Sequence, residues 1–166
     1  MNRIYLRQFK ISDITKEYIH YLNDSKVMKQ TESKYTIWTK DRCKKYIRKS
    51  NKEGILLGIF LSSNGKHLGN IRLSNINITH KRVELGILIY NPKNWNKGYG
   101  TEALFEVDKW IFGFWGFHKI CADYYSINQA SAKMFKKAGY KIEGIFKDHF
   151  YMDNKYIDSI RVAKIK

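Results

Sequence analysis

The chain has 166 residues, 43% of them hydrophobic and 15% aromatic, and a formal net charge of +16, which is typical of one globular domain over residues 1–166 and excludes a disordered chain. Lysine outnumbers arginine 24 to 7 and is scattered, so we expect a surface that attracts polyanions rather than a nucleic-acid-binding protein, because arginine is the better reader of phosphates and bases. The sequence has no run of ~18 apolar residues and no apolar stretch in residues 1–7, so we expect neither a membrane partner nor a signal peptide. Cys43 and Cys121 lack the spacing of metal ligands, so we expect free thiols, no metal and a cytoplasmic protein.

Strand and helix patterns alternate in the first half of the chain. Residues 3–9 alternate as a strand, and a helix follows from a cap at Ser12–Asp13 to Leu22. Residues 26–35 are irregular or contain a short helical turn, and Thr39 caps a helix that ends near residue 49. Three strands then form a meander, over residues 54–61, 66–76 and 81–90.

The second half begins with a loop over residues 91–98. The predicted elements after it are a helix, a strand, a helix ended by Gly139, and two strands, over residues 101–114, 119–125, 128–138, 140–146 and 155–165. The order β-α-α-β-β-β-α-β-α-β-β predicts a mixed α/β sheet with helices on both faces.

Two glycines, Gly98 and Gly100, open the helix that follows the third meander strand. Free backbone N–H groups at such a helix start bind anions, and Lys97 adds a positive charge. A tight turn without a ligand is the alternative for a bare G-x-G. A dinucleotide-binding fold is excluded because Ala103 stands where its third glycine would be.

The run W-N-K-G-Y-G-T-E-A at residues 95–103 resembles motif A of the GNAT acetyltransferase superfamily, Q/R-x-x-G-x-G/A. Trp95 at the first position resembles the ribosomal-protein-alanine (RimJ/RimL-like) branch. Further blocks resemble that branch in the same order, at residues 128–131 (N-Q-A-S), 135–140 (F-K-K-A-G-Y), 143–144 (E-G) and 155–158 (K-Y-I-D). The likeness covers nearly the whole chain.

The resemblance implies a GNAT-like, mostly antiparallel central sheet with helices on both faces, a splayed strand pair, and acetyl-CoA as co-substrate. It places the CoA pyrophosphate on the backbone of five residues: Lys97, Gly98, Tyr99, Gly100 and Thr101. It places the pantetheine arm in the splay, where a backbone N–H of Ile87, Leu88 or Ile89 polarises the thioester. It also makes Asn128 and Ser131 contacts of the CoA arm, with a simple helix cap as the alternative for Asn128.

By the same resemblance Glu84, the acid of an E-I/L-G motif, is the general base, directly or through water. We expect burial to raise its pKa; the alternative is a structural ion pair with a nearby lysine or arginine, such as Arg72 or Arg82. The general acid stays open, because many members of the family have a tyrosine where this chain has Phe135. Tyr140, Ser131 and water are the alternatives.

The resemblance builds the acceptor site from the first two helices, their connecting loop and the late hairpin. The candidate residues are Asn23, Asp24, Lys34, Tyr35, Glu84, His149 and Tyr151. Residues 21–24 and 69–73 resemble bacterial enzymes that acetylate nucleotide-linked aminosugars, so a nucleotide sugar is the first expected substrate. A protein N-terminus and a polyamine are alternatives, the polyamine being disfavoured by few carboxylates. A basic nucleic-acid-binding module is the non-enzymatic alternative, and a homodimer stays open.

Overall fold

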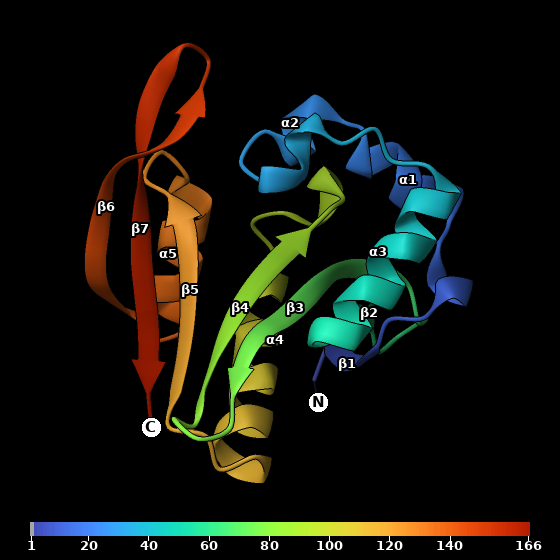
Figure 1. Cartoon of the computed structure of the whole chain (residues 1–166). Helices are drawn as coiled ribbons and strands as arrows, with labels where there is room; N and C mark the ends of the chain where they lie inside the picture. The colour runs from blue at the N-terminus through green and yellow to red at the C-terminus, as the bar shows by residue number, and fades with distance from the viewer. Residues whose placement is uncertain (1) are drawn as a thin grey trace.

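The alternating segments pair into a single sheet of seven strands in the computed structural model, which describes residues 2–166 (Figure 1). The order across the sheet is β1 (Ile4–Gln8), β2 (Ile55–Leu61), β3 (His67–Asn77), β4 (Arg82–Ile89), β5 (Lys119–Tyr125), β7 (Lys155–Ile165) and β6 (Lys141–Met152). Every neighbouring pair is antiparallel except β4–β5. The predicted mixed, mostly antiparallel sheet is therefore confirmed.

The parallel pair β4–β5 is joined over only three residues, from Arg82↔Lys119 to Glu84↔Cys121. β4 stays paired with β3 as far as Ile89, and β5 stays paired with β7 as far as Tyr125. The two strands therefore diverge beyond Glu84, as Figure 1 shows. The predicted splayed pair is confirmed, and we call the region between the diverging strands the splay.

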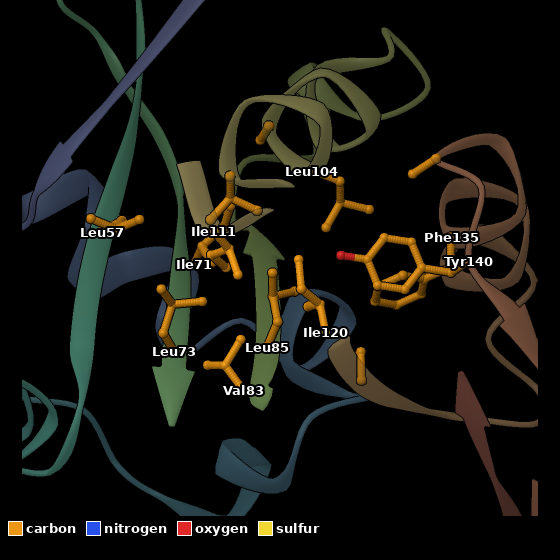
Figure 2. Close-up of a cluster of buried hydrophobic side chains, with 14 of the residues drawn as sticks. Leu57, Ile71, Leu73, Val83, Leu85, Leu104, Ile111, Ile120, Phe135 and Tyr140 are labelled. Carbon is orange, nitrogen blue, oxygen red and sulfur yellow. The ribbon is translucent and has the colours of Figure 1, made fainter. Parts of the chain in front are cut away.

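Helices cover both faces of the sheet and bury a core on each. The larger core packs α4 (Tyr99–Asp108) and α5 (Gln129–Lys137) against the sheet, and Figure 2 shows its side chains. The second core lies under α1 (Lys16–Leu22), α2 (Ser25–Met28) and α3 (Lys40–Glu53). β4 contributes to both cores by alternation, because Leu85 belongs to the first and Leu88 packs against the second. Each fully buried aliphatic side chain contributes ~1.5–3 kcal/mol.

The predicted first helix begins later than expected. Ser12 and Asp13 lie in a 3-10 turn (Ile11–Asp13), and α1 begins after Thr15, whose side chain accepts the Tyr18 N–H. The expected cap at Ser12–Asp13 is wrong because the Asp13 carboxylate pairs with Arg7. The cap at Thr39 is confirmed, and α3 extends to Glu53.

Short elements complete the chain. Residues 26–35 hold α2 and a 3-10 turn at Glu32–Tyr35, and a further 3-10 turn lies at Pro92–Asn94. α4 continues into a π-helix at Lys109–Phe114. β6 runs beyond the expected residue 146, because a bulge between Phe146 and Phe150 lets it stay paired with β7. The tip of this hairpin and α2 lie at the end of the sheet toward which β4 and β5 part (Figure 1).

Candidate active site

The first turn of α4 presents unpaired backbone donors. Gly98 caps the helix at φ 82°, a left-handed conformation that favours glycine, and offers no side-chain cap. The first N–H that bonds back toward the loop is that of Glu102, which donates to the Gly98 carbonyl at 3.0 Å. The N–H groups of Tyr99, Gly100 and Thr101 precede it and are free of intrahelical partners. This geometry suits the predicted anion site.

Gly100 is required by close packing as well. A Cβ at this position would lie 2.6 Å from the Met134 sulfur of α5 and 3.8 Å from the Ile89 Cγ1 of β4. The missing side chain therefore lets the start of α4 lie against both α5 and the end of β4. The loop, the splay and α5 meet at this residue.

Arg3 secures the loop from the opposite end of the chain. Its Nε donates to the Glu102 carboxylate at 2.8 Å, and its Nη1 donates to the Lys97 carbonyl at 3.1 Å. Its guanidinium also lies 4.8 Å from the centroid of the Tyr99 ring. Arg3 was missed in the sequence because no local pattern links residues more than 90 positions apart. A cavity of about 320 Å³ lies here, with basic side chains in its wall from Arg3, Lys97 and Lys137.

Two amides of β4 point into the splay. The Tyr90 N–H donates to the Leu68 carbonyl of β3 at 3.2 Å. Antiparallel ladders alternate, so the N–H of Leu88 also faces β3, whereas those of Ile87 and Ile89 face away from it. The prediction for Leu88 as a donor is therefore wrong, and the other two remain. The Trp95 indole N–H donates to the Ile89 carbonyl at 2.7 Å and fastens the loop to β4.

Asn128 caps α5, as its alternative interpretation expected. Its Oδ1 accepts the Ser131 N–H at 3.0 Å. The side-chain amide of Asn128 and the half-buried hydroxyl of Ser131 remain available to a ligand, so their contact with CoA stays a prediction.

Glu84 lies at the point where the splay opens, but in an ion pair. One carboxylate oxygen accepts from Arg161 at 2.8 Å and the other from Asn75 at 2.7 Å. Burial alone would raise the pKa of Glu84, but these two hydrogen bonds outweigh it and lower the pKa. The expected raised pKa is wrong, and the partner is neither Arg72 nor Arg82. β7 supplies Arg161, which sequence proximity could not reveal.

Tyr140 is remote from the splay. Its hydroxyl donates to Asp108 at 2.7 Å inside the larger core, where its ring packs against Phe135 (Figure 2). Burial and the neighbouring carboxylate raise its pKa far above the usual range of a tyrosine. The expectation that Tyr140 serves as general acid is wrong, because its proton is held in this buried contact. Ser131 and water remain as candidates.

Tyr35 meets the late hairpin, as predicted, whereas Lys34 contacts the end of β5. The Tyr35 hydroxyl donates to the Tyr151 carbonyl at 3.4 Å. The Lys34 ammonium donates to the Tyr125 hydroxyl at 3.4 Å, and that hydroxyl donates to the Glu32 carboxylate. Burial and Glu32 raise the pKa of Tyr125 above its ordinary range. We call Glu32, Lys34 and Tyr125 the acceptor-side triad; the sequence did not single out Glu32 or Tyr125.

Two predicted acceptor residues have structural roles. The Asn23 side chain bonds to the Ile19 carbonyl and to both backbone groups of Trp38. Asp24 caps α2 by accepting two backbone N–H groups. The assignment of Asn23 as a substrate contact is therefore wrong, because its hydrogen-bonding groups hold the chain turn between α1 and α2. The Asp24 cap uses only Oδ1, and Oδ2 accepts no hydrogen bond within residues 2–166, so substrate contact by Asp24 stays a prediction.

His149 lies on β6 away from the acceptor-side triad. Its ring contacts Phe146 and Phe150, and no hydrogen bond joins it to the triad in the part of the chain that the structure describes. Tyr151 stays near Tyr35 through its carbonyl, and its ring packs on Tyr156. Substrate contact by His149 and Tyr151 stays a prediction.

Residues 3–141 match the family model described as an acetyltransferase (GNAT) domain. The chain belongs to the GNAT acetyltransferase family. The predicted superfamily is therefore confirmed, and the match covers the loop at Gly98, the splay and α5.

Relatives of this GNAT domain include other N-acetyltransferases. It is 28% identical over 108 residues to the uncharacterized N-acetyltransferase YoaA of Bacillus subtilis (strain 168), spanning 65% of this chain and 60% of that protein. It is 27% identical to YnaD of the same organism over 97% of this chain and 92% of that protein. It is 26% identical to the spermidine N(1)-acetyltransferase of Escherichia coli (strain K12), over 60% of this chain and 53% of that protein.

Solved GNAT structures share the fold over nearly the full chain. An acetyltransferase (GNAT family) from Bacillus anthracis is 26% identical and superposes with a TM-score of 0.84, covering 98% of this chain and 95% of that one. Spermidine N-acetyltransferase from Vibrio cholerae, in complex with CoA and spermine, has the same TM-score and coverage at 18% identity. Within residues 2–166, no helix has the length and apolar character needed to cross a membrane.

Proposed function

We propose that this GNAT protein transfers the acetyl group of acetyl-CoA to the primary amine of a small molecule. The observation that carries the proposal is a track of backbone donors without partners. It begins at the N–H groups of Tyr99, Gly100 and Thr101 and continues to those of Ile87 and Ile89 in the splay. Such a track matches a ligand with a diphosphate at one end and a thioester at the other.

The residues present fit acetyl-CoA. The diphosphate would accept hydrogen bonds at the start of α4, where Arg3, Lys97 and Lys137 add positive charge. The thioester carbonyl would accept from the Ile87 or Ile89 N–H, which stabilises the negative charge that develops on that oxygen when an amine attacks. Asn128 and Ser131 would contact the arm between these ends.

For the acceptor, we infer a cationic amine ahead of a nucleotide-linked aminosugar. The loss of Asn23 to a structural role leaves the sugar with fewer polar contacts. Glu32 adds a carboxylate beside the tyrosines of the acceptor side, which weakens the earlier argument against a polyamine. The spermidine acetyltransferase among the relatives points the same way.

The test combines acetyl-CoA with a panel of di- and polyamines, nucleotide-linked aminosugars and peptides with free N-termini, and follows thiol release. We expect release with a small amine, and a rise in Tm with acetyl-CoA alone, because binding at 100 times Kd stabilises a fold by ~2.7 kcal/mol. Absence of both effects would contradict the proposal. Release that is confined to peptides would replace the acceptor class.

A further inference from the structure

The Lys34 ammonium occupies a site that is built for a cation. It lies 5.0 Å from the centroid of the Tyr125 ring and 5.1 Å from that of Tyr35, within the range of cation–π attraction. The Tyr125 hydroxyl accepts its hydrogen bond and donates its own proton to Glu32. An amine, a phenol and a carboxylate thus stand in sequence along one hydrogen-bonded chain.

This chain lies beside the splay. β4 and β5 run in parallel from the pair Glu84↔Cys121, so Tyr125 and Leu88 each lie four residues beyond it, on opposite sides of the splay. Tyr125 lies two residues after Asp123 on β5, so their side chains share a face of the sheet. Arg161 pairs with both Asp123 and Glu84, which places the Glu84 side chain on the same face. The acceptor-side triad is therefore attached to the β5 side of the splay, on the sheet face that Glu84 also occupies.

We infer that the Lys34 ammonium occupies the position of the acceptor amine, that Tyr125 and Glu32 receive its proton, and that the protein consequently acetylates its own Lys34. The inference rests on the proposed function, since it requires acetyl-CoA in the splay.

The step balances as an acyl transfer. Lys34 loses one ammonium proton through the Tyr125 hydroxyl to the Glu32 carboxylate, and the freed lone pair attacks the acetyl carbonyl carbon. A C–N bond forms, the C–S bond breaks, and the electron pair leaves on sulfur. The second nitrogen proton passes through water to the thiolate, so that the products are an amide and the CoA thiol. Glu32 then releases its proton to solvent.

Glu32 suits this task better than Glu84. Both oxygens of Glu84 accept hydrogen bonds, from Arg161 and Asn75, which stabilise the ionised carboxylate and make it a weaker proton acceptor. Glu32 accepts from Tyr125 alone among the hydrogen bonds of residues 2–166, and Tyr125 is the group that contacts the amine.

The experiment incubates the full chain with acetyl-CoA and locates acetyl groups by intact mass and peptide mapping. We expect one acetyl group on Lys34, at a rate constant independent of protein concentration. Lys29 is the internal reference, because it lies close by in the chain, is 56% exposed and forms an exposed ion pair with Asp153 at 3.3 Å. Acetyl groups spread over exposed lysines, Lys29 included, would overturn the inference.

Variants test the proton path. Tyr125→Phe keeps the stacking on Phe150 (4.2 Å between centroids) but removes the hydroxyl, and we expect it to slow Lys34 acetylation ~100-fold, as should Glu32→Gln. Tyr5→Phe, on the far edge strand β1, is the matched control and should leave the rate unchanged. Melting curves show whether each variant folds. If Tyr125→Phe does not fold, the rate of Lys34 acetylation in Glu32→Gln tests the proton path. An unchanged rate in a folded Glu32→Gln protein would overturn the inference.

Removal of the Lys34 ammonium from the acceptor position gives a second readout. Lys34→Met should lower the KM of an external amine roughly tenfold with little change in its KM for acetyl-CoA, because the site no longer has to release an ammonium. An unchanged amine KM would show that Lys34 lies outside the acceptor position. A protein that acetylates amines but never Lys34 refutes only this inference, whereas no thiol release and no rise in Tm refutes the proposed function as well.

Discussion

Single residues determine the conformation and the packing of the loop before α4. Gly98 is held at φ 82° and Gly100 lies in close contact with α5 and β4. The first glycine is needed for backbone conformation and the second for space. Both needs would exist in a protein without a ligand, so the free N–H groups beside them carry the functional argument.

Gly98→Ala should lower the free energy of unfolding by about 1–2 kcal/mol, because a left-handed conformation brings Cβ too close to the backbone. It should also reduce the rise in Tm caused by acetyl-CoA. Urea unfolding measures the first effect. Gly113→Ala is the matched control, since a Cβ there meets nothing within 4 Å and the φ angle is not left-handed; an equal loss in both variants would contradict the role of Gly98.

Glu84→Gln separates a structural acid from a catalytic one. The change weakens the bond to Arg161, so we expect a loss of ~1–3 kcal/mol in stability and a smaller fall in turnover than Glu32→Gln produces. Stability and turnover are measured on the same preparations. A large loss of turnover at unchanged stability would restore Glu84 as the general base.

At the scale of elements, the site depends on contacts between segments that are distant in the chain. Arg3, directly before β1, holds the loop before α4, and the Trp95 side chain holds that loop to the end of β4. The triad likewise joins the Glu32–Tyr35 turn to the end of β5. The donor half and the acceptor half are thus secured by different elements.

Arg3→Gln should raise the KM for acetyl-CoA on the order of tenfold while kcat changes little. The reason is that the change removes positive charge and leaves Glu102 without its ion-pair partner beside the proposed diphosphate position. Steady-state kinetics give both constants. Arg48→Gln is the control, because it makes the same charge change at an exposed position on α3, and an equal KM effect there would indicate net charge rather than a local contact.

At the scale of the whole molecule, two cores on opposite faces hold the sheet while β4 and β5 part between them. The second core encloses His67, whose ring packs against Phe9, Phe60, Tyr18 and Tyr90. Its Nε2 lies 2.7 Å from the Gly69 carbonyl. Burial lowers the pKa of His67 from 6.5 to about 4, against a smaller opposing effect of this hydrogen bond.

This lowered pKa predicts a pH dependence of stability. The unfolded chain binds a proton at His67 below pH 6.5, whereas the folded protein does not until about pH 4, so stability is lost as the pH falls through this window. The loss reaches about 3 kcal/mol. Urea unfolding at several pH values measures it, and His67→Phe should remove that part of the slope; an identical slope in the variant would contradict the assignment.

The sequence by itself determined the order of the strands and helices and the helix start at Gly98, and the resemblance of its motifs to a known family implied the splayed pair. These features depend on periodicity, on glycines and caps, and on a run of neighbouring residues, all of which are local. The errors concern residues whose role depends on a distant partner: Glu84 meets Arg161, Tyr140 meets Asp108, and Asn23 meets Trp38.

Only the tertiary structure decided which partners the acids near the splay have. It brought Glu32 to Tyr125 and paired Glu84 with Arg161, across 93 and 77 positions of sequence. The physical reason is that the availability of a carboxylate depends on which donors the fold places around it. A strand pattern shows which face a side chain occupies, but the neighbouring strand supplies the partner.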